Sequence, residues 1–160
     1  MELYIGLSTT RVSSVFNDKN AEHVKFKPVK DFVCSGVGKV IYGGNTYKKE
    51  LQRAGRHLKF VMELRKAGRA ILVRDDVVDK LEGEISEKTQ GKKCDDPHIV
   101  ALLSASNCGL LCSNDQRSFP FIHDKSLYKR GNCDVKIYTS PRNKNILIKQ
   151  KARLWNVVKS

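Results

Sequence analysis

The segment CDDPHIVALLSASNCGLLCSND, Cys94–Asp115, decides the expected fold because it joins a helix start, a helix and a buried strand. Asp96 is suited to the N-cap of a helix, and Pro97 is suited to its first helical position. The apolar residues that follow predict a helix over 96–107. The run GLLCS, at 109–113, then predicts a buried strand, so the segment indicates a helix packed on a sheet.

The same alternation of strands and helices continues on both sides of this segment. Short apolar runs predict strands at 2–7, 37–45, 69–73 and 135–139. Helices are expected from Pro28 to a stop at Gly36, over 46–67 with a C-cap at Gly68, and over 75–90. Strands that alternate with helices form parallel sheets covered on both faces. The expected fold is therefore α/β and Rossmann-like, with a central parallel sheet.

Charge gives the first indication of function. The 160 residues include 30 Lys and Arg against 17 Asp and Glu, which gives a formal net charge of +13. A field of that sign attracts polyanions, so nucleic acid is the expected partner. No apolar run is long enough to span a bilayer, the start lacks a signal peptide, and the five cysteines form no regular framework. We therefore expect a cytoplasmic protein with reduced thiols and no membrane partner.

Three acids from separate elements are expected to meet at one edge of the sheet. Asp115 follows the strand 109–113, Asp96 precedes the helix that leads into that strand, and Glu50 lies early in the helix 46–67. Chemistry in open parallel sheets collects outside the carboxyl ends of the strands. Several carboxylates form a hard-oxygen site suited to Mg²⁺ or Mn²⁺. In a basic protein, that combination predicts metal-assisted cleavage of a phosphodiester.

Each of these acids also has a purely structural interpretation. Asp96 alone is typical of an N-cap, Asp115 of a turn before the next helix, and Glu50 of a solvated partner for Arg53 or Lys49. A zinc site from Cys94, His98, Cys108 and Cys112 is disfavoured because the chain has no CxxC pair. The order and context of Glu50, Asp96 and Asp115 together favour the metal site.

The segment 95–115 resembles the second half of a PIN-domain nuclease, which has an Asp, a helix with small residues, a buried strand, and then Thr/Ser-x-Asp. Here Asp96, Ala101, Ser113 and Asp115 match that pattern, and YKKEL at 47–51 places Glu50 at the helical Glu of the family. The resemblance implies a Rossmann-like fold and a divalent-metal endoribonuclease activity. It also implies that Asp96 and Asp115 are metal ligands and that Glu50 is a ligand or positions water. Ser113 and Asn114 would support the metal or the phosphate.

The first strand departs from the family pattern, which has an Asp at its end followed by small hydroxyl residues. In YIGLSTT, at 4–10, Gly6 stands where that Asp is expected. Either Ser8, Thr9 or the additional acid Asp95 completes a reduced site, or the chain binds RNA or a partner without cutting, or Gly6 is an inactivating substitution. The alternative function is therefore a catalytically silent PIN-like domain that binds RNA or a protein.

Basic side chains near the expected site are the candidates for contacting RNA. They are Lys49, Arg53 and Arg56 on the helix of Glu50, and Arg117 just beyond Asp115. The helix residues could equally form an ordinary solvated face. We expect a nuclease domain over 1–140 and a basic tail over 141–160 that packs on it. The resemblance further implies a toxin or defence role, an antitoxin or other regulatory protein as partner, and a homodimer.

Overall fold

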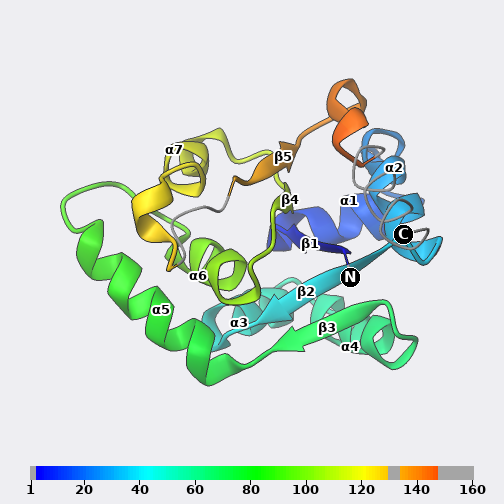
Figure 1. Cartoon of the computed structure of the whole chain (residues 1–160). Helices are drawn as coiled ribbons and strands as arrows, with labels where there is room; N and C mark the ends of the chain where they lie inside the picture. Colours follow the sequence, from blue (N-terminus) through cyan, green and yellow to red (C-terminus); the bar gives the residue numbers. More distant parts are fainter. Residues whose placement is uncertain (1–2, 130–133, 148–160) are drawn as a thin grey trace, which may run out of the picture.

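A computed structural model describes residues 3–129 and 134–147 and contains a five-stranded, all-parallel sheet with helices on both sides (Figure 1). The strand order is β3-β2-β1-β4-β5. The strands are β1 (Leu3–Leu7), β2 (Gly38–Gly43), β3 (Ala70–Val73), β4 (Leu110–Cys112) and β5 (Lys136–Tyr138). The predicted α/β class with a central parallel sheet is confirmed, and the architecture is consistent with a Rossmann-like PIN fold.

Strand β1 lies at the centre of the sheet, and its register places Gly6 among apolar residues. Gly6 is aligned with Ile41 on β2 and with Leu111 on β4. Ile5 and Leu7 are fully buried on either side of it. Because a central parallel strand is covered on both faces, such a strand is apolar along its whole length rather than alternating.

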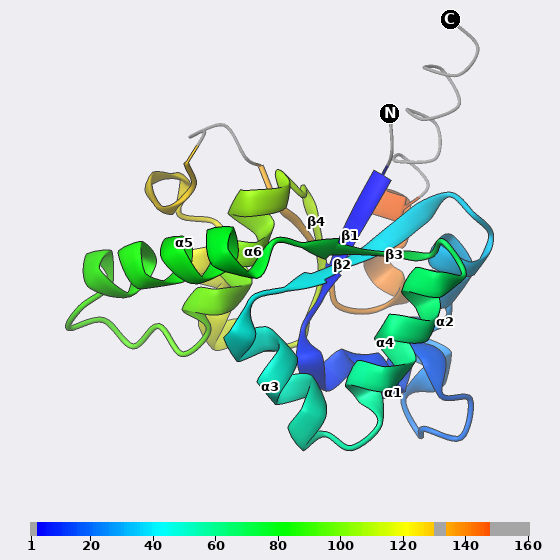
Figure 2. The ribbon, with the colours of Figure 1, turned by 90° about the horizontal axis from the view of Figure 1, so that it is seen from below.

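Four helices follow β1 and β2, and Figure 2 shows them on one side of the sheet. They are α1 (Val12–Phe16), α2 (His23–Cys34), α3 (Asn45–Arg53) and α4 (His57–Lys66). The prediction that Pro28 starts a helix was wrong, since α2 begins at His23 and contains Pro28. Proline has no backbone N–H, so the carbonyl of Val24, in the first turn of α2, receives no helical hydrogen bond from Pro28. The side chain of Val24 is 81% exposed.

The long helix expected over 46–67 is two helices, α3 and α4. The chain reverses at Gly55, which has φ +88°, a conformation that glycine adopts without steric cost. The buried residues Leu51 and Val61 lie on either side of the break. Leu51, Ala54, Leu58 and Met62 keep a spacing of three and four residues across the break, which is why the apolar pattern alone did not reveal the turn. The break separates Glu50 from the basic residues that follow Arg53.

The remaining helices cover the other side of the sheet or its end. Helix α5 (Asp75–Lys88) packs along α6 (Pro97–Ser106), and α6 contacts β1, β2 and β3. The short helix α7 (Phe119–Ile122) connects β4 toward β5, between the 3₁₀ turns η2 (Gln116–Ser118) and η3 (Lys125–Leu127). None of the helices in residues 3–129 and 134–147 is both long and apolar enough to cross a membrane.

Only the beginning of the predicted basic tail falls within the described residues. The 3₁₀ turns η1 (Thr9–Arg11) and η4 (Pro141–Asn143) complete the elements, and η4 contacts α2. Residues 148–160, which carry most of the tail, lie outside the described part of the chain. The division into 1–140 and 141–160 therefore stays a prediction.

Candidate metal centre

The carboxyl edge of the sheet brings together residues from β1, α3 and α6. The backbone N–H of Ser8 donates to the carbonyl of Cys112 (2.9 Å), which joins the end of β1 to the end of β4. The hydroxyl of Tyr47 on α3 donates to the carbonyl of Leu7 (2.6 Å). Tyr47 is almost completely buried, and burial raises the pKa of its hydroxyl, with the charge of Glu50 adding to the effect. This bond fixes α3, and with it Glu50, against the end of β1.

Glu50, Asp96 and His98 form the one cluster of potential metal ligands found among residues 3–129 and 134–147. Each offers one ligand atom, and these atoms all lie within 4.8 Å of one another. Glu50 projects from α3, Asp96 immediately precedes α6, and His98 lies in the first turn of α6. Two carboxylates and one imidazole at this spacing match the donor set of a divalent transition metal.

Glu50 and His98 are oriented toward each other in this cluster. Nε2 of His98 and Oε1 of Glu50 are in contact as a possible ion pair. Both atoms are buried, however, and within the described structure neither has a hydrogen-bond partner of acceptable geometry. His98 is only 3% exposed. Each of these two buried atoms therefore has the other as its polar contact, and a cation bound at the cluster would take the place of that contact.

Asp96 carries the electrostatic signature expected of a cation site. Its pKa is raised, chiefly because the carboxyl group is removed from water, while the neighbouring acids Glu50 and Asp115 add to the effect and His98 opposes it. Asp96 occupies the N-cap position of α6, yet its side chain makes no capping hydrogen bond. The structural interpretation of Asp96 as a capping residue therefore does not account for its side chain.

Asp115 lies beside Asp96 but outside the cluster of three. It contributes to the raised pKa of Asp96 through its charge and through a side-chain hydrogen bond. Its carboxylate also accepts from the backbone N–H of Arg117 (3.3 Å), so it acts as the turn acid that starts η2. Ser113 is buried, and its hydroxyl accepts from the backbone N–H of Asp115 (3.2 Å). Ser113 thus positions Asp115, whereas Asn114 is exposed.

The structure corrects the position assigned to the missing acid of the first strand. A Cβ added to Gly6 would lie 3.1 Å from Leu103 Cδ2 and 3.4 Å from Leu111 Cδ1, inside the core. A side chain at position 6 would therefore pack against these two leucines rather than enter open space. The residue that follows the end of β1 is Ser8, whose hydroxyl lies 3.1 Å from that of Thr10.

Thr10 lines a hollow of about 350 Å³ together with Thr9, Glu50, Arg53 and His57. Ser8 directly precedes Thr9 and Thr10, which line the hollow that contains Glu50. In this hollow Nδ1 of His57 is buried and has no hydrogen-bond partner among the described residues. The hollow combines a carboxylate, hydroxyl groups and a cationic side chain at the carboxyl edge.

The predicted RNA-contacting residues do not share one surface. Arg53 lines the hollow that contains Glu50, Arg56 lines a separate hollow beside α1, and Lys49 lines a third between α3 and α4. The guanidinium group of Arg117 lies 3.4 Å from Asp115 and 3.9 Å from Asp95, so here it pairs with acids. The side chain of Asp95 is 59% exposed.

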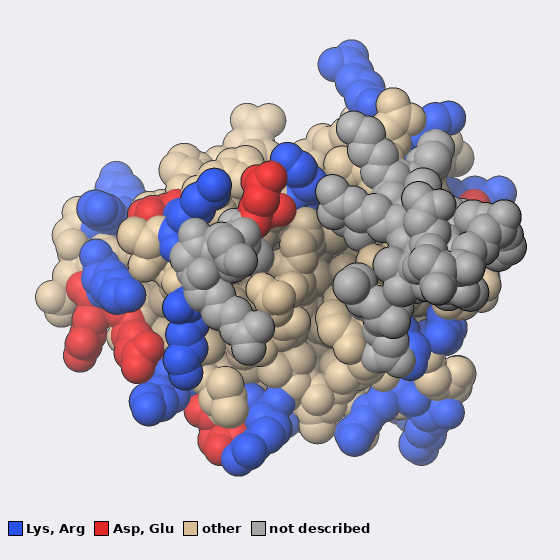
Figure 3. All heavy atoms as spheres, viewed as in Figure 1, with Lys and Arg blue, Asp and Glu red and all other residues tan. Residues whose placement is uncertain are grey.

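On the face shown in Figure 3, basic residues are spread out rather than gathered in one patch. Figure 3 shows lysine and arginine side chains around the rim of the face seen in Figure 1, interrupted by acids. A field of this kind attracts a polyanion from many directions without fixing where it binds. The position of Arg53 beside Glu50 is therefore a better guide to the substrate path than the net charge.

The cysteines of residues 3–129 and 134–147 do not form a zinc site. Cys108 and Cys112 are buried within and beside β4, and burial raises the pKa of the Cys112 thiol to about 12. The Cys108 thiol lies 3.3 Å from the carbonyl of Tyr4. In the described residues no cysteine joins His98 in a ligand cluster.

Sequence reasoning missed His98 as a partner of the acids and considered it only as a zinc ligand. The available signal was its position two residues after Asp96, in the first turn of the same helix. Comparisons of the chain with protein-family models, with curated proteins and with solved structures give no match. The functional proposal therefore rests on the residues themselves.

Proposed function

We propose that this protein is a metal-dependent endoribonuclease of PIN type, which hydrolyses RNA phosphodiester bonds at the Glu50–Asp96–His98 cluster. The observation that carries the proposal is the convergence of three ligand atoms within 4.8 Å. Two of these atoms, Oε1 of Glu50 and Nε2 of His98, are buried and in contact with each other. Asp115 at the same edge and the net charge of +13 support it.

The donor set favours Mn²⁺ over Mg²⁺. Carboxylate oxygens suit both ions, whereas an imidazole nitrogen suits transition metals better than magnesium. Glu50, Asp96 and His98 would hold the ion. Asp115 would contribute its negative charge from its position beside Asp96. A bound divalent ion lowers the pKa of a coordinated water and stabilises charge on the leaving oxygen.

The chain's own residues would place the substrate next to this cluster. Arg53 in the hollow beside Glu50 can pair with a phosphate, and Thr9 and Thr10 can donate hydroxyl hydrogen bonds to it. His57 offers Nδ1, which has no hydrogen-bond partner within the described residues, on the same wall. Tyr47 keeps α3 against β1 and so holds Glu50 in place.

A catalytically silent RNA- or partner-binding domain is the second candidate. The observation that favours it is the end of β1, where Leu7 is buried and Ser8 follows, so no acid extends from this central strand. In that case the contact of Glu50 with His98, rather than a metal ion, would stabilise the cluster. A cytoplasmic toxin or defence effector, restrained by an antitoxin and acting as a homodimer, is proposed from the family resemblance only.

The decisive experiment measures metal binding and RNA cleavage in the same preparations. Purified protein is titrated with Mn²⁺ by calorimetry and then incubated with labelled single-stranded RNA. His98→Asn and Asp96→Asn are the test variants, and Asp76→Asn, an exposed acid away from the cluster, is the matched control. The proposal expects Mn²⁺ binding and cleavage in the starting protein and the control, and loss of both in the two test variants. RNA binding without metal binding or cleavage would favour the silent domain.

A further inference from the structure

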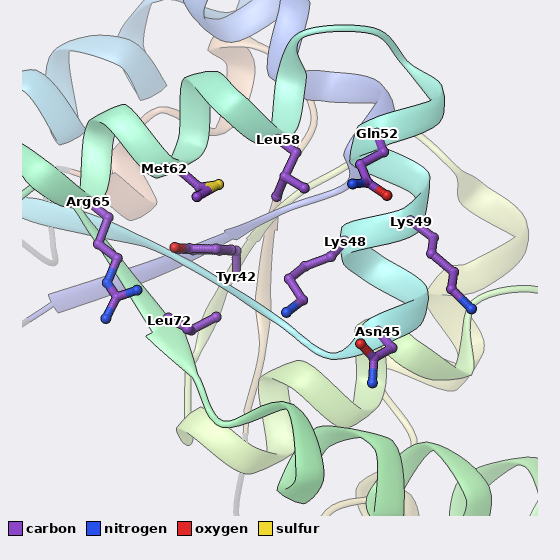
Figure 4. A pocket seen from close by; sticks show the side chains of 9 residues that line it. All are labelled: Tyr42, Asn45, Lys48, Lys49, Gln52, Leu58, Met62, Arg65 and Leu72. Atoms are coloured by element: carbon purple, nitrogen blue, oxygen red, sulfur yellow. The ribbon is translucent and has the colours of Figure 1, made fainter.

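A second hollow lies between α3 and α4 on one side and β2 and β3 on the other. It has a volume of about 350 Å³, and it shares no lining residue with the Glu50–Asp96–His98 cluster. This volume is at the lower end of the range of small-ligand sites, roughly 300–1,000 Å³. Figure 4 shows side chains from two helices and two strands around it, so the hollow is a feature of the packed fold.

The floor of this hollow is formed by Tyr42, whose side chain carries a hydroxyl group. Tyr42, on β2, is only 2% exposed, and its ring lies across the floor with the hydroxyl turned toward Met62 and Arg65 (Figure 4). No residue of the described ranges forms a hydrogen bond with this hydroxyl. The group is therefore free to hydrogen-bond with a bound molecule that has a polar edge.

The walls of the hollow are apolar and partly open to water. Leu58 and Met62 on α4 form one wall, and Leu72 on β3 faces them (Figure 4). Met62 is 48% exposed, one of the few large apolar side chains so exposed in the described structure. A thioether and two leucines facing each other provide a slot for a flat ring, and the thioether of methionine favours aromatic partners.

Cationic side chains lie at both ends of the slot, and only some of them form an ion pair with an acid in the described residues. Lys48 forms an ion pair with Asp75, and this pairing lowers the pKa of the Asp75 carboxyl. Lys49 and Arg65 are exposed and pair with no acid in the part of the chain that the structure describes. Figure 4 shows Arg65 at the end toward which the Tyr42 hydroxyl turns. An anionic group on the ligand would therefore meet Arg65 first.

We propose that this hollow binds a nucleotide, with the base in the slot between Met62 and Leu72 and the phosphate on Arg65. The Tyr42 hydroxyl would hydrogen-bond to the edge of the base. A fatty acid would leave this hydroxyl unused, and a bare phosphate would leave the apolar slot empty, so a flat polar ring with an anionic group fits best. The nucleotide can be a free mononucleotide or one residue of an RNA strand, since both present the same chemistry.

The test measures binding of the four ribonucleoside monophosphates and of a labelled single-stranded RNA to the full chain in the presence of a chelator. The chelator separates this site from the proposed metal centre, so failure of one does not imply failure of the other. The variants are Arg65→Gln and Tyr42→Phe. Lys59→Gln is the control because Lys59 is an exposed cation on the same helix that does not line the hollow.

Loss of a charged hydrogen bond to the phosphate should weaken binding by about tenfold or more in Arg65→Gln. Tyr42→Phe should weaken it several-fold, and Lys59→Gln by less than about twofold. If the mononucleotides bind and show this order of losses, a free nucleotide is sufficient for binding. If only the RNA binds and shows this order, the ligand is a nucleotide within a strand. Absence of saturable binding to either probe, or equal losses in Arg65→Gln and Lys59→Gln, would overturn the proposal.

Discussion

Replacing Gly6 by aspartate tests the assignment of the first strand most sharply. If position 6 faced the metal centre, the new carboxylate would complete it. The structure instead directs the side chain at Leu103 and Leu111, both at most 1% exposed, with the added Cβ 3.1 Å from the first. Overpacking a core of this kind costs about 1–3 kcal/mol, and burying an unpaired polar group costs about 1–3 kcal/mol more. We therefore expect Gly6→Asp to destabilise the protein by about 2–6 kcal/mol.

The assay is urea unfolding followed by circular dichroism, with Gly6→Ala as the control. Alanine adds the Cβ without the carboxyl group, so the difference between the two variants isolates the buried polar group. Natural domains are stable by only about 5–15 kcal/mol, so the midpoint of Gly6→Asp should fall far below that of the starting protein. Ser8→Asp should leave the midpoint nearly unchanged and tighten Mn²⁺ binding, because Ser8 directly precedes Thr9 and Thr10, which line the hollow that contains Glu50. A Gly6→Asp protein that is as stable as the starting protein and binds Mn²⁺ more tightly would refute this reasoning.

Three further predictions concern the candidate centre. Tyr47→Phe leaves the buried carbonyl of Leu7 without its donor and should lower the free energy of unfolding by about 1–3 kcal/mol; an unchanged urea midpoint would contradict this. Burial raises the pKa of Asp96, so the charged carboxylate destabilises the folded state at pH values above the usual pKa of an aspartate. This destabilisation disappears as the pH falls and the carboxyl group becomes protonated. In chelator, Asp96→Asn should therefore be more stable than the starting protein at pH 7, with a gain that shrinks toward acidic pH; a loss at pH 7 would argue against it. His98→Gln should weaken Mn²⁺ binding by about tenfold or more but affect Mg²⁺ less, as calorimetry would show; equal losses would remove His98 from the ligand set.

The sheet could be predicted from the sequence because its strands are short apolar runs bounded by turns. Helix boundaries were harder. Pro28 suggested a helix start, although the helix begins at His23 and buries Phe26 before the proline. The turn at Gly55 was hidden because apolar residues on its two sides keep a helical spacing. In both cases tertiary packing, which a periodic pattern does not encode, decided the boundary.

The site was predictable in part. Placing Glu50 and Asp96 at one edge followed from the rule that parallel strands end together, and the structure does bring these two residues together. His98 was missed because its position two residues after Asp96 does not by itself separate a ligand from a histidine packed in an apolar helix. The direction of Gly6 was also inaccessible, since it depends on how β1 is packed against α6 rather than on its neighbours in sequence.

The most direct test of the central proposal is cleavage of labelled single-stranded RNA with Mn²⁺ and with chelator, using the starting protein and Asp96→Asn. The proposal predicts metal-dependent cleavage by the starting protein, none in chelator, and none by Asp96→Asn even though that variant is folded. Cleavage that persists in Asp96→Asn, or no cleavage by a folded starting protein that binds RNA, would contradict it.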